Sequence, residues 1–181
     1  MPTQIALLRG VNVGGKAMVA MAELRELFAE LGFADARTLL QSGNVVFEAP
    51  SAQTPAALEQ KLEAAAAKRF DRPIDFFVRS AKDWAGVIAK NPFPAEAQRD
   101  PAHLVLMALK AAPSAAAVKA LKAAIKGRET VNAAGRHAYI VYPDGIGRSK
   151  LTNALIERTL GTRGTGRNWN TALKLAEMVE S

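Results

Sequence analysis

Residues 36–48, with the sequence ARTLLQSGNVVFE, decide the fold of the amino-terminal half of this chain. Residues 36–41 and 44–48 have the composition of two short strands, and the triplet Ser-Gly-Asn separates them. Gly-Asn is a recognised pair in tight β-hairpin loops. The stretch therefore predicts a β-hairpin, and the elements on either side of it set the topology.

The neighbouring elements complete one domain around the hairpin. Residues 4–8 form an apolar run typical of a buried strand, and residues 21–31 carry apolar side chains at helical spacing before Gly32. An alanine-rich helix is predicted at 55–70 and an extended apolar segment at 74–79. The order β-α-β-β-α-β is that of a ferredoxin-like split βαβ fold, an α+β class in which helices pack on one face of an antiparallel sheet.

The second half of the chain repeats most of this order. A short helix at 84–88 precedes residues 91–101, which contain three prolines and no periodicity and are predicted as a linker. The later elements are predicted as a strand, a helix, a two-stranded hairpin and a helix, at residues 103–110, 114–125, 129–133 with 137–142, and 149–160. Residues 170–179 are predicted as a helix and not as a sixth strand, because their leucines suit helical spacing. We therefore expect an incomplete second copy, with domains at 1–90 and 102–181.

The composition limits the classes of protein to which the chain can belong. Its 181 residues are 49% apolar and 23% charged, which permits a sizeable core in one large or two small domains. It has no cysteine, which excludes disulfides, thiolate nucleophiles and zinc-thiolate sites. No segment has the length and hydropathy of a signal peptide or a membrane span. These features predict a cytoplasmic protein without a membrane partner, and no spacing typical of metal ligands is present.

The formal net charge of +7 is unevenly distributed along the chain. Residues 1–90 hold 11 basic and 10 acidic side chains, whereas residues 91–181 hold 13 and 7. An excess of this kind favours anionic partners such as phosphorylated metabolites or nucleic acid, although a basic surface also serves solubility alone.

The first candidate loop, residues 9–17, has the sequence RGVNVGGKA. Gly10, Gly15 and Lys16 fit the spacing G-x-x-x-x-G-K of phosphate-binding loops, in which glycines bring backbone N–H groups to phosphate oxygens. Ala17 replaces the hydroxyl residue that holds magnesium, and the predicted sheet is not parallel, so a nucleoside triphosphatase is disfavoured. The candidate ligand-binding residues offer charge, amide groups or backbone access to an anion: Arg9, Asn12, Gly14, Gly15 and Lys16.

Three further loops carry polar residues that a simple connection does not need. In the hairpin loop these residues are Gln41, Ser42 and Asn44. Before the helix predicted at 149–160 they are Arg148, Ser149 and Lys150, with Ser149 as the expected N-cap and two cations beside it. Near the carboxyl terminus they are Arg167, Asn168, Trp169 and Asn170, in which the indole could stack on a ring or anchor the loop to the core.

Candidates for side-chain catalysis are few. His103 and His137 both fall in predicted strands without a neighbouring Ser-Asp pair or a metal-ligand spacing, so a structural role is expected for each. The sequence therefore indicates binding more strongly than any particular reaction.

The motifs together resemble a known bacterial family. LLRGVNVGGK at residues 7–16, MAELRELFAELGF at 21–33 and LQSGNVVF at 40–47 are similar to the family designated domain of unknown function 1697. The later stretches NPF, RSKLTN and RNWNT fit the same family, so the resemblance covers nearly the whole chain. It implies a ferredoxin-like α+β architecture and no established activity, substrate or catalytic residues.

The leading functional hypothesis is binding of a phosphorylated small molecule or another anion through these loops. One alternative is an enzyme acting on a phosphorylated or carboxylated substrate, with a cation stabilising developing charge. Another is a nucleic-acid-binding or protein-interaction module. Nucleic acid is the weaker partner, because the hairpin strand at 44–48 offers only Phe47 and lacks the aromatic signature of RNA-recognition modules. No cofactor is indicated.

Overall fold

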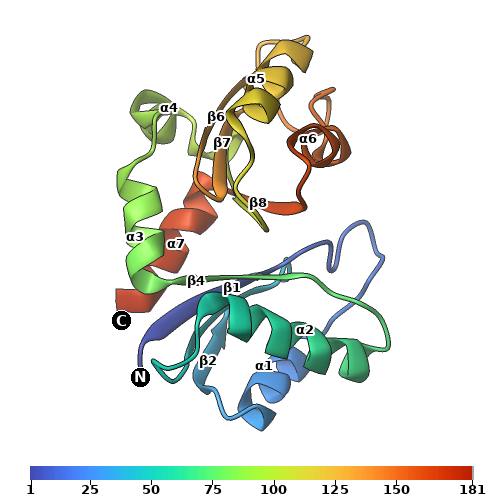
Figure 1. The fold of residues 1–181 in the computed structure, drawn as a ribbon, viewed down its shortest axis with the longest axis vertical. Helices are drawn as coiled ribbons and strands as arrows, with labels where there is room; N and C mark the ends of the chain where they lie inside the picture. Colours follow the sequence, from blue (N-terminus) through green and yellow to red (C-terminus); the bar gives the residue numbers. More distant parts are fainter. Residues whose placement is uncertain (181) are drawn as a thin grey trace. The chain divides into compact units, whose positions relative to one another are not determined.

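The computed structural model describes residues 1–180 and contains two compact units (Figure 1). The first unit comprises Met1–Gly86 together with the residues after Lys174, and the second comprises Val87–Lys174. The segment 91–101, predicted as a linker, belongs to the second unit and contains helix α4 (Pro94–Arg99) and the 3-10 turn η1, which begins at Pro101. Proline is tolerated in a first helical turn, where its missing N–H is not required, so Pro94 and Pro101 begin helical turns here.

The first unit has the predicted β-α-β-β-α-β order. Its elements are β1 (Thr3–Leu8), α1 (Met21–Glu30), β2 (Ala34–Thr38), β3 (Asn44–Glu48), α2 (Pro55–Phe70) and β4 (Phe76–Ser80), followed by α3 (Ala81–Ala89). The strands form one antiparallel sheet in the order β2-β3-β1-β4. This is the ferredoxin-like arrangement, and the predicted fold class is confirmed.

The core of the first unit lies between this sheet and the helices α1 and α2. Alternate strand residues such as Leu8 and Phe76 pack against helix residues such as Phe28 and Leu62, and all four are fully buried. Phe28 and Phe47 meet edge to face with ring centroids 4.9 Å apart, a favourable geometry for aromatic pairs. The period-2 and period-3.6 apolar patterns in the sequence therefore mark the two sides of a single core.

The loop of the β2–β3 hairpin is longer than the sequence predicted. β2 ends at Thr38 and β3 begins at Asn44, so the loop contains residues 39–43 and is not a two-residue Gly-Asn turn. The side chain of Asn44 is fully buried and donates to Leu39 O at 2.7 Å and to Ser42 Oγ at 3.0 Å. These side-chain hydrogen bonds satisfy the backbone of a wider loop, which explains the shift.

The second unit repeats the whole order of the first. Its elements after η1 are β5 (Leu104–Leu109), α5 (Ala115–Ala124), β6 (Thr130–Ala134), β7 (His137–Val141), α6 (Asn153–Leu160) and β8 (Gly164–Asn168), followed by α7 (Trp169–Glu180). The sheet has the order β6-β7-β5-β8 and is antiparallel, which matches the first sheet strand for strand. The expected incomplete copy is therefore complete, and the chain consists of two related halves.

The sixth strand of the second half, β8, was not expected from its sequence GTGRN. Glycine and asparagine have low strand propensity, so local pattern gives no signal. Glycine suits the close pairing with β5, because a Cβ on Gly164 would lie 2.8 Å from Leu109 Cδ2 and one on Gly166 would lie 2.8 Å from Val105 Cγ1, so these side chains would have to move. Close approach of two strands, which is a tertiary property, selects this sequence.

The two halves also share the way in which they close the edge of the sheet. The N–H of Phe76, the first residue of β4, donates to Glu63 of α2 at 2.9 Å. At the equivalent register position, the N–H of Gly164 in β8 donates to Glu157 of α6 at 2.9 Å. A helix carboxylate thus pairs with an edge-strand donor in both units, which protects that edge.

Candidate functional site

The loop after β1 contains a small hairpin and does not have the geometry of a G-x-x-x-x-G-K phosphate-binding loop. Lys16 N donates to Val13 O at 3.0 Å, and the two residues between them, Gly14 and Gly15, have φ values of +58° and +73°. Two positive φ values are those of a type I′ hairpin turn. Since the N–H of Lys16 closes this turn and α1 begins only at Met21, the G-x-x-x-x-G-K spacing does not build a backbone cradle in front of a helix.

Asn12 joins this hairpin to the loop between β2 and β3. Its Oδ1 accepts from Val19 N at 2.7 Å, and its Nδ2 donates to Val19 O at 2.9 Å and to Gln41 O at 2.5 Å. Asn12 N also donates to Ala17 O at 3.0 Å. The first two candidate loops therefore meet within the first unit, where the side chains of Lys16 and Gln41 are exposed.

Three other candidates in this region have structural partners. Asn44 is fully buried, and its amide supports the loop at residues 39–43 instead of facing solvent. Arg9 pairs with Asp75 at 3.7 Å, where its guanidinium keeps about a third of its surface exposed. Ser42 is exposed and accepts from Asn44. Charge and hydrogen-bonding capacity at this loop pair therefore come mainly from Lys16 and Gln41.

The loop between β7 and α6 differs from its prediction. α6 begins at Asn153, and the side chain of Thr152 accepts from Leu155 N at 3.2 Å as the N-cap. The prediction of a helix from residue 149 with Ser149 as its cap is wrong, because Thr152 satisfies the first turn. The helix dipole therefore does not explain the cations on either side of Ser149.

Arg148 and Lys150 instead line a cleft with the loop between α5 and β6. The cleft has a volume of about 260 Å³. Its lining comes from these two loops: Lys126, Gly127, Glu129, Asp144, Gly145, Arg148, Ser149 and Lys150. Arg148, Lys150 and Lys126 are exposed, and within residues 1–180 none of the three forms an ion pair. Three cationic side chains thus share one concave surface.

The carboxylates of this cleft are held in different ways. Ser149 Oγ donates to Glu129 Oε1 at 2.7 Å, while Glu129 Oε2 is buried and has no hydrogen-bond partner within the described chain. Arg128 forms a two-point ion pair with Asp144, and its hydrogen bond lowers the pKa of that carboxyl. Burial, with a further contribution from Glu129, raises the pKa of Tyr142 to about 12. Glu129 Oε2 is therefore a buried acceptor beside the cations.

An apolar cleft adjoins the basic one. It has a volume of about 370 Å³, and the two clefts share Lys126, Gly127, Glu129 and Lys150. Beyond the shared residues it is lined by Ile125, Leu151 and Leu155 with Ala124. Together they form a two-lobed cleft with one basic and one apolar lobe, a combination typical of small-molecule sites.

The fourth candidate group, residues 167–170, lies on β8 and at the start of α7. Arg167 is 8% exposed, donates to Thr165 Oγ1 at 2.7 Å, and burial lowers its pKa to about 10. Asn168 Oδ1 accepts from Thr171 N at 3.0 Å, which caps α7, and Trp169 is buried. Arg167 stands opposite Leu106, on the face of the sheet away from α5 and α6, so this group is separate from the two-lobed cleft.

The sequence analysis did not identify a pair formed by a histidine and an aspartate. His103 lies in η1 and not in a strand, and its Nδ1 is 2.8 Å from Asp100 Oδ2. Its Nε2 lies 4.0 Å from the position of a Cβ on Gly145, a residue that lines the basic lobe. The spacing Asp-x-x-His before a strand was the available signal, but only the turn at η1 brings the two side chains together.

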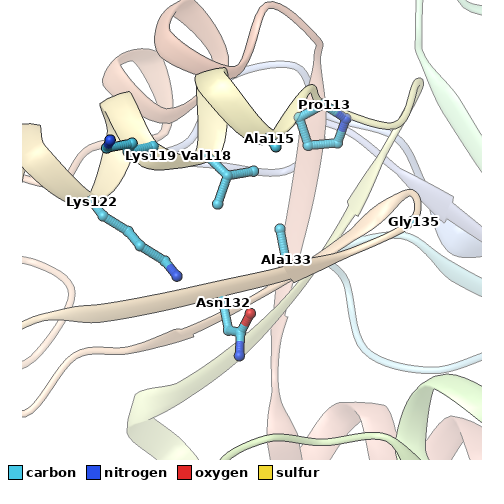
Figure 2. A pocket seen from close by; sticks show the side chains of 8 residues that line it. All are labelled: Pro113, Ala115, Val118, Lys119, Lys122, Asn132, Ala133 and Gly135. Carbon is cyan, nitrogen blue, oxygen red and sulfur yellow. The ribbon is translucent and has the colours of Figure 1, made fainter.

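A second groove in the second unit lies between α5 and the β6–β7 hairpin. Figure 2 shows Val118 and Lys122 of α5 pointing toward Ala133 of β6. The groove has a volume of about 470 Å³, and its cations, Lys119 and Lys122, both come from the exposed side of one helix. Polar groups do not converge on it from several elements, so the two-lobed cleft is the stronger candidate.

The charge is distributed more unevenly between the two structural units than between the two halves of the sequence. The second unit, Val87–Lys174, holds fourteen basic and five acidic side chains, whereas the first holds ten and twelve. The excess positive charge of the protein therefore belongs to the unit that contains the two-lobed cleft, and it favours anions there.

Two other kinds of feature are absent from residues 1–180. No group of three or more His, Asp or Glu side chains is arranged to hold a metal ion. No helix in the described part of the chain has the length and hydropathy needed to cross a bilayer.

Comparison with known proteins supports the fold and the family. The conserved bacterial protein SP0830 from Streptococcus pneumoniae has a similar structure, with a TM-score of 0.76, 25% sequence identity and coverage of 98% of both chains. No curated protein matches the chain. The family model described as protein of unknown function DUF1697 matches residues 1–139, which is well over half of the sequence. The chain therefore belongs to the DUF1697 family.

Proposed function

We propose that the protein binds a phosphorylated small molecule, or another anion of similar size, in the two-lobed cleft of the second unit. The observation that carries this proposal is the convergence of Lys126, Arg148 and Lys150 on one cleft without ion-pair partners in the described chain. Cations that surround a concave site and lack internal partners are suited to an anionic ligand.

The adjoining surfaces narrow the class of ligand. Ile125, Leu151 and Leu155 offer an apolar surface next to the cations, so the ligand is expected to have an apolar part beside its anionic group. Glu129 Oε2 is buried without a partner at the boundary of the two lobes, where it can accept a hydrogen bond from a ligand hydroxyl or amino group. A phosphate ester with an apolar part and a hydroxyl or amino group fits all three features.

The test is ligand binding to matched charge variants. Wild-type protein is titrated with inorganic phosphate, pyrophosphate, nucleotides and sugar phosphates by calorimetry and thermal shift. The double variant Arg148→Ala/Lys150→Ala removes two cations of the cleft, and Lys119→Ala/Lys122→Ala removes two cations of the Figure 2 groove with the same change in net charge. Each lost charge-assisted contact is expected to weaken binding about tenfold or more.

The outcomes distinguish binding at this cleft from non-specific attraction of anions to a basic protein. Selective loss in the cleft variant supports the proposal, whereas equal loss in both variants indicates non-specific attraction to a basic unit. Affinity that falls steeply with salt for oligonucleotides, but not for small phosphates, would replace the small molecule by nucleic acid. The proposal includes a cytoplasmic location, which fractionation of cells checks.

One observation favours an enzyme as the second candidate. Asp100 orients His103 so that Nδ1 faces the carboxylate and Nε2 is the free basic nitrogen, near Gly145 at the basic lobe. An enzyme acting on a phosphorylated substrate would use this nitrogen to take a proton. The variant His103→Gln should then keep its affinity for the ligand and lose turnover, which phosphorus NMR measures. If the wild type turns over none of the phosphate esters that it binds, the enzyme is excluded.

A further inference from the structure

The two loops of the first unit at residues 9–20 and 39–43, named here the loop platform, exceed what the fold requires. The second unit supplies an internal control, because it has the same strand order. There the equivalent connections are residues 110–114 and residues 135–136. A connection of five residues replaces one of twelve, and a turn of two residues replaces one of five. Closing the fold therefore does not explain the added residues of the platform.

The platform is ordered by side-chain hydrogen bonds and strained backbone. Asn12 connects the two loops, and the side chain of the buried Asn44 donates to Leu39 O in the second loop. Asn12, Ala17 and Leu40 have φ values of +55°, +54° and +59°, in the left-handed region that disfavours residues with a side chain. Gly43 leaves no room for a Cβ, which would lie 2.8 Å from Leu8 Cβ. Strain of this kind persists where the surroundings impose it and is frequent at functional surfaces.

What this ordered backbone presents to solvent is mostly apolar. Val13, Met18 and Leu40 are 62%, 69% and 59% exposed, and they account for half of the large apolar side chains exposed in the described chain. Leu40 is held outward although its backbone conformation is unfavourable for leucine. Each of the three lies next to a residue of the hydrogen-bond network around Asn12, because Val13 follows Asn12, Met18 lies between Ala17 and Val19, and Leu40 precedes Gln41. Exposed apolar side chains brought together on adjoining loops mark interaction surfaces.

The rim of the platform has a defined charge. Neither loop contains an acidic residue, and because Arg9 pairs with Asp75, the positive charge of the rim comes from Lys16. Lys16 forms no ion pair within residues 1–180, and Gln41, next to Leu40 in the sequence, has an exposed side-chain amide. A complementary surface is therefore apolar at its centre and acidic at its edge.

We propose that the loop platform docks a protein partner through an apolar segment flanked by Asp or Glu. The hydrogen bonds of Asn12 and Asn44 set the conformation of the platform, which favours a protein over a lipid surface, since a fluid bilayer does not require apolar side chains to be positioned by a hydrogen-bonded backbone. A partner with its own shape does require this, because preorganised contacts reduce the entropic cost of binding. Val13, Met18 and Leu40 then provide the buried centre of the contact, and Lys16 pairs with an acidic residue at the edge.

The test uses peptides as probes for the intact protein. A displayed library of random twelve-residue peptides is selected against the wild type, and the enriched peptides are measured by fluorescence polarisation. The platform variant Val13→Ser/Met18→Ser/Leu40→Asn removes the apolar centre, and Asn at residue 40 tolerates positive φ. Ile146→Ser is the matched control, because Ile146 is 49% exposed and lies in the other unit.

The expected peptides combine apolar residues with Asp or Glu and lose affinity about tenfold or more in the platform variant, with no change in the control. Lys16→Glu should weaken them by about threefold to tenfold, more strongly at low salt. Peptides that bind the platform variant equally well, or that are not acidic, would overturn the proposal. Sedimentation with vesicles of phosphatidylglycerol and phosphatidylcholine that depends on the same three side chains would replace the protein partner by a lipid surface. Thermal unfolding of each variant, with the same midpoint as the wild type, confirms that lost binding is not lost folding.

Discussion

The two halves of the chain are built on the same sheet order and differ in where they carry additional chemistry. In the first unit the addition is geometric, since two long loops form an ordered and partly apolar platform while the charges nearly balance. In the second unit the same connections are short, and the addition is electrostatic, with fourteen basic and five acidic side chains. The difference shows that the fold alone requires neither feature, so each feature is a candidate for function.

The shared features define what the fold does require. Thr54 and Thr152 cap the equivalent helices α2 and α6, and their side chains accept from the N–H three residues later. Ser80 and Asn168 end the last strand of each sheet and cap α3 and α7 in the same way. Helix caps and edge-strand carboxylates recur in both copies because they satisfy backbone groups that every copy of this fold leaves unpaired.

The largest effect is expected where equivalent positions are filled by residues of opposite size. Phe76 of β4 and Gly164 of β8 occupy the same register position, and Phe76 is fully buried. Phe76→Ala should destabilise the first unit by about 3–5 kcal/mol through the cavity that it leaves. Urea unfolding followed by tryptophan fluorescence measures this, with Trp84 reporting the first unit in a Trp169→Phe background. A loss below about 1 kcal/mol would show that the core relaxes around the site.

A substitution that adds a side chain at the equivalent position tests the close approach of β5 and β8. Gly164→Ala places a Cβ 2.8 Å from Leu109 Cδ2 and 3.1 Å from Ala108 O, so overpacking should cost about 1–3 kcal/mol. Trp169 reports the second unit in a Trp84→Phe background. The same substitution at Gly135, where a Cβ meets nothing within 4 Å, is the control for the loss of glycine, although its φ of +57° adds some strain of its own. An unchanged Gly164→Ala protein would contradict the strand-packing explanation for β8.

Alkaline pH should distinguish the units. Both tyrosines of the chain, Tyr139 and Tyr142, lie in the second unit, and burial raises both pKa values, that of Tyr142 to about 12. A raised folded-state pKa means that the unfolded chain ionises first, so the stability is full below the ordinary value of 10.0 and falls as the pH rises from there toward 12. Burial lowers the pKa of Arg167 in the same unit to about 10, which favours the folded state over the same range of pH, so the tyrosine effect is isolated by comparison with Tyr142→Phe. As the pH rises from about 8 to about 11, the wild type should lose more stability than this variant, measured by tyrosinate absorbance and by urea unfolding with Trp169 fluorescence. Ionisation of both tyrosines near pH 10 without unfolding would show that they are accessible to solvent.

The smallest effect is expected at the ion pair between Arg128 and Asp144 beside the cleft. The hydrogen bond from Arg128 lowers the pKa of Asp144 below its ordinary 3.8, so the pair stabilises the protein above that pH and the contribution disappears as the pH falls through the lowered value. Both side chains are exposed, so the effect is small and screened by salt. Asp144→Asn should be slightly less stable than the wild type at pH 7 and equal to it at low pH. A difference that persists at low pH would indicate a role for Asp144 other than charge.

Prediction from the sequence succeeded where a signal was local and periodic. The apolar spacing of α1, the alanine-rich α2 and the run at β1 are confirmed, and so is the ferredoxin-like order of the first half. Prediction failed where a partner far along the chain determined the outcome. β8 has a sequence of turn residues and becomes a strand because it pairs with β5. The late start of α6 is a local exception, because Thr152 and not Ser149 caps its first turn.

The candidate residues follow the same division. The sequence identified Asn12, Gln41, Arg148 and Lys150 because polar residues exceeded what their loops needed. It did not indicate that Asn12 and Gln41 are joined, that Lys126 and Glu129 complete a cleft with Arg148, or that His103 pairs with Asp100. Each of these associations joins side chains whose meeting depends on how separate turns are packed.

The amino-acid sequence by itself determined the α+β class, the positive charge, the absence of cysteine chemistry and most helix and strand positions, because these depend on composition and on contacts within a few residues. Only the tertiary structure decided that the second half is a full copy, that charge is concentrated in one unit, and that the loops form a platform in one unit and a cleft in the other. The physical reason is that strand pairing, burial and convergence of charges are set by distances between residues remote in the chain, which local periodicity does not encode.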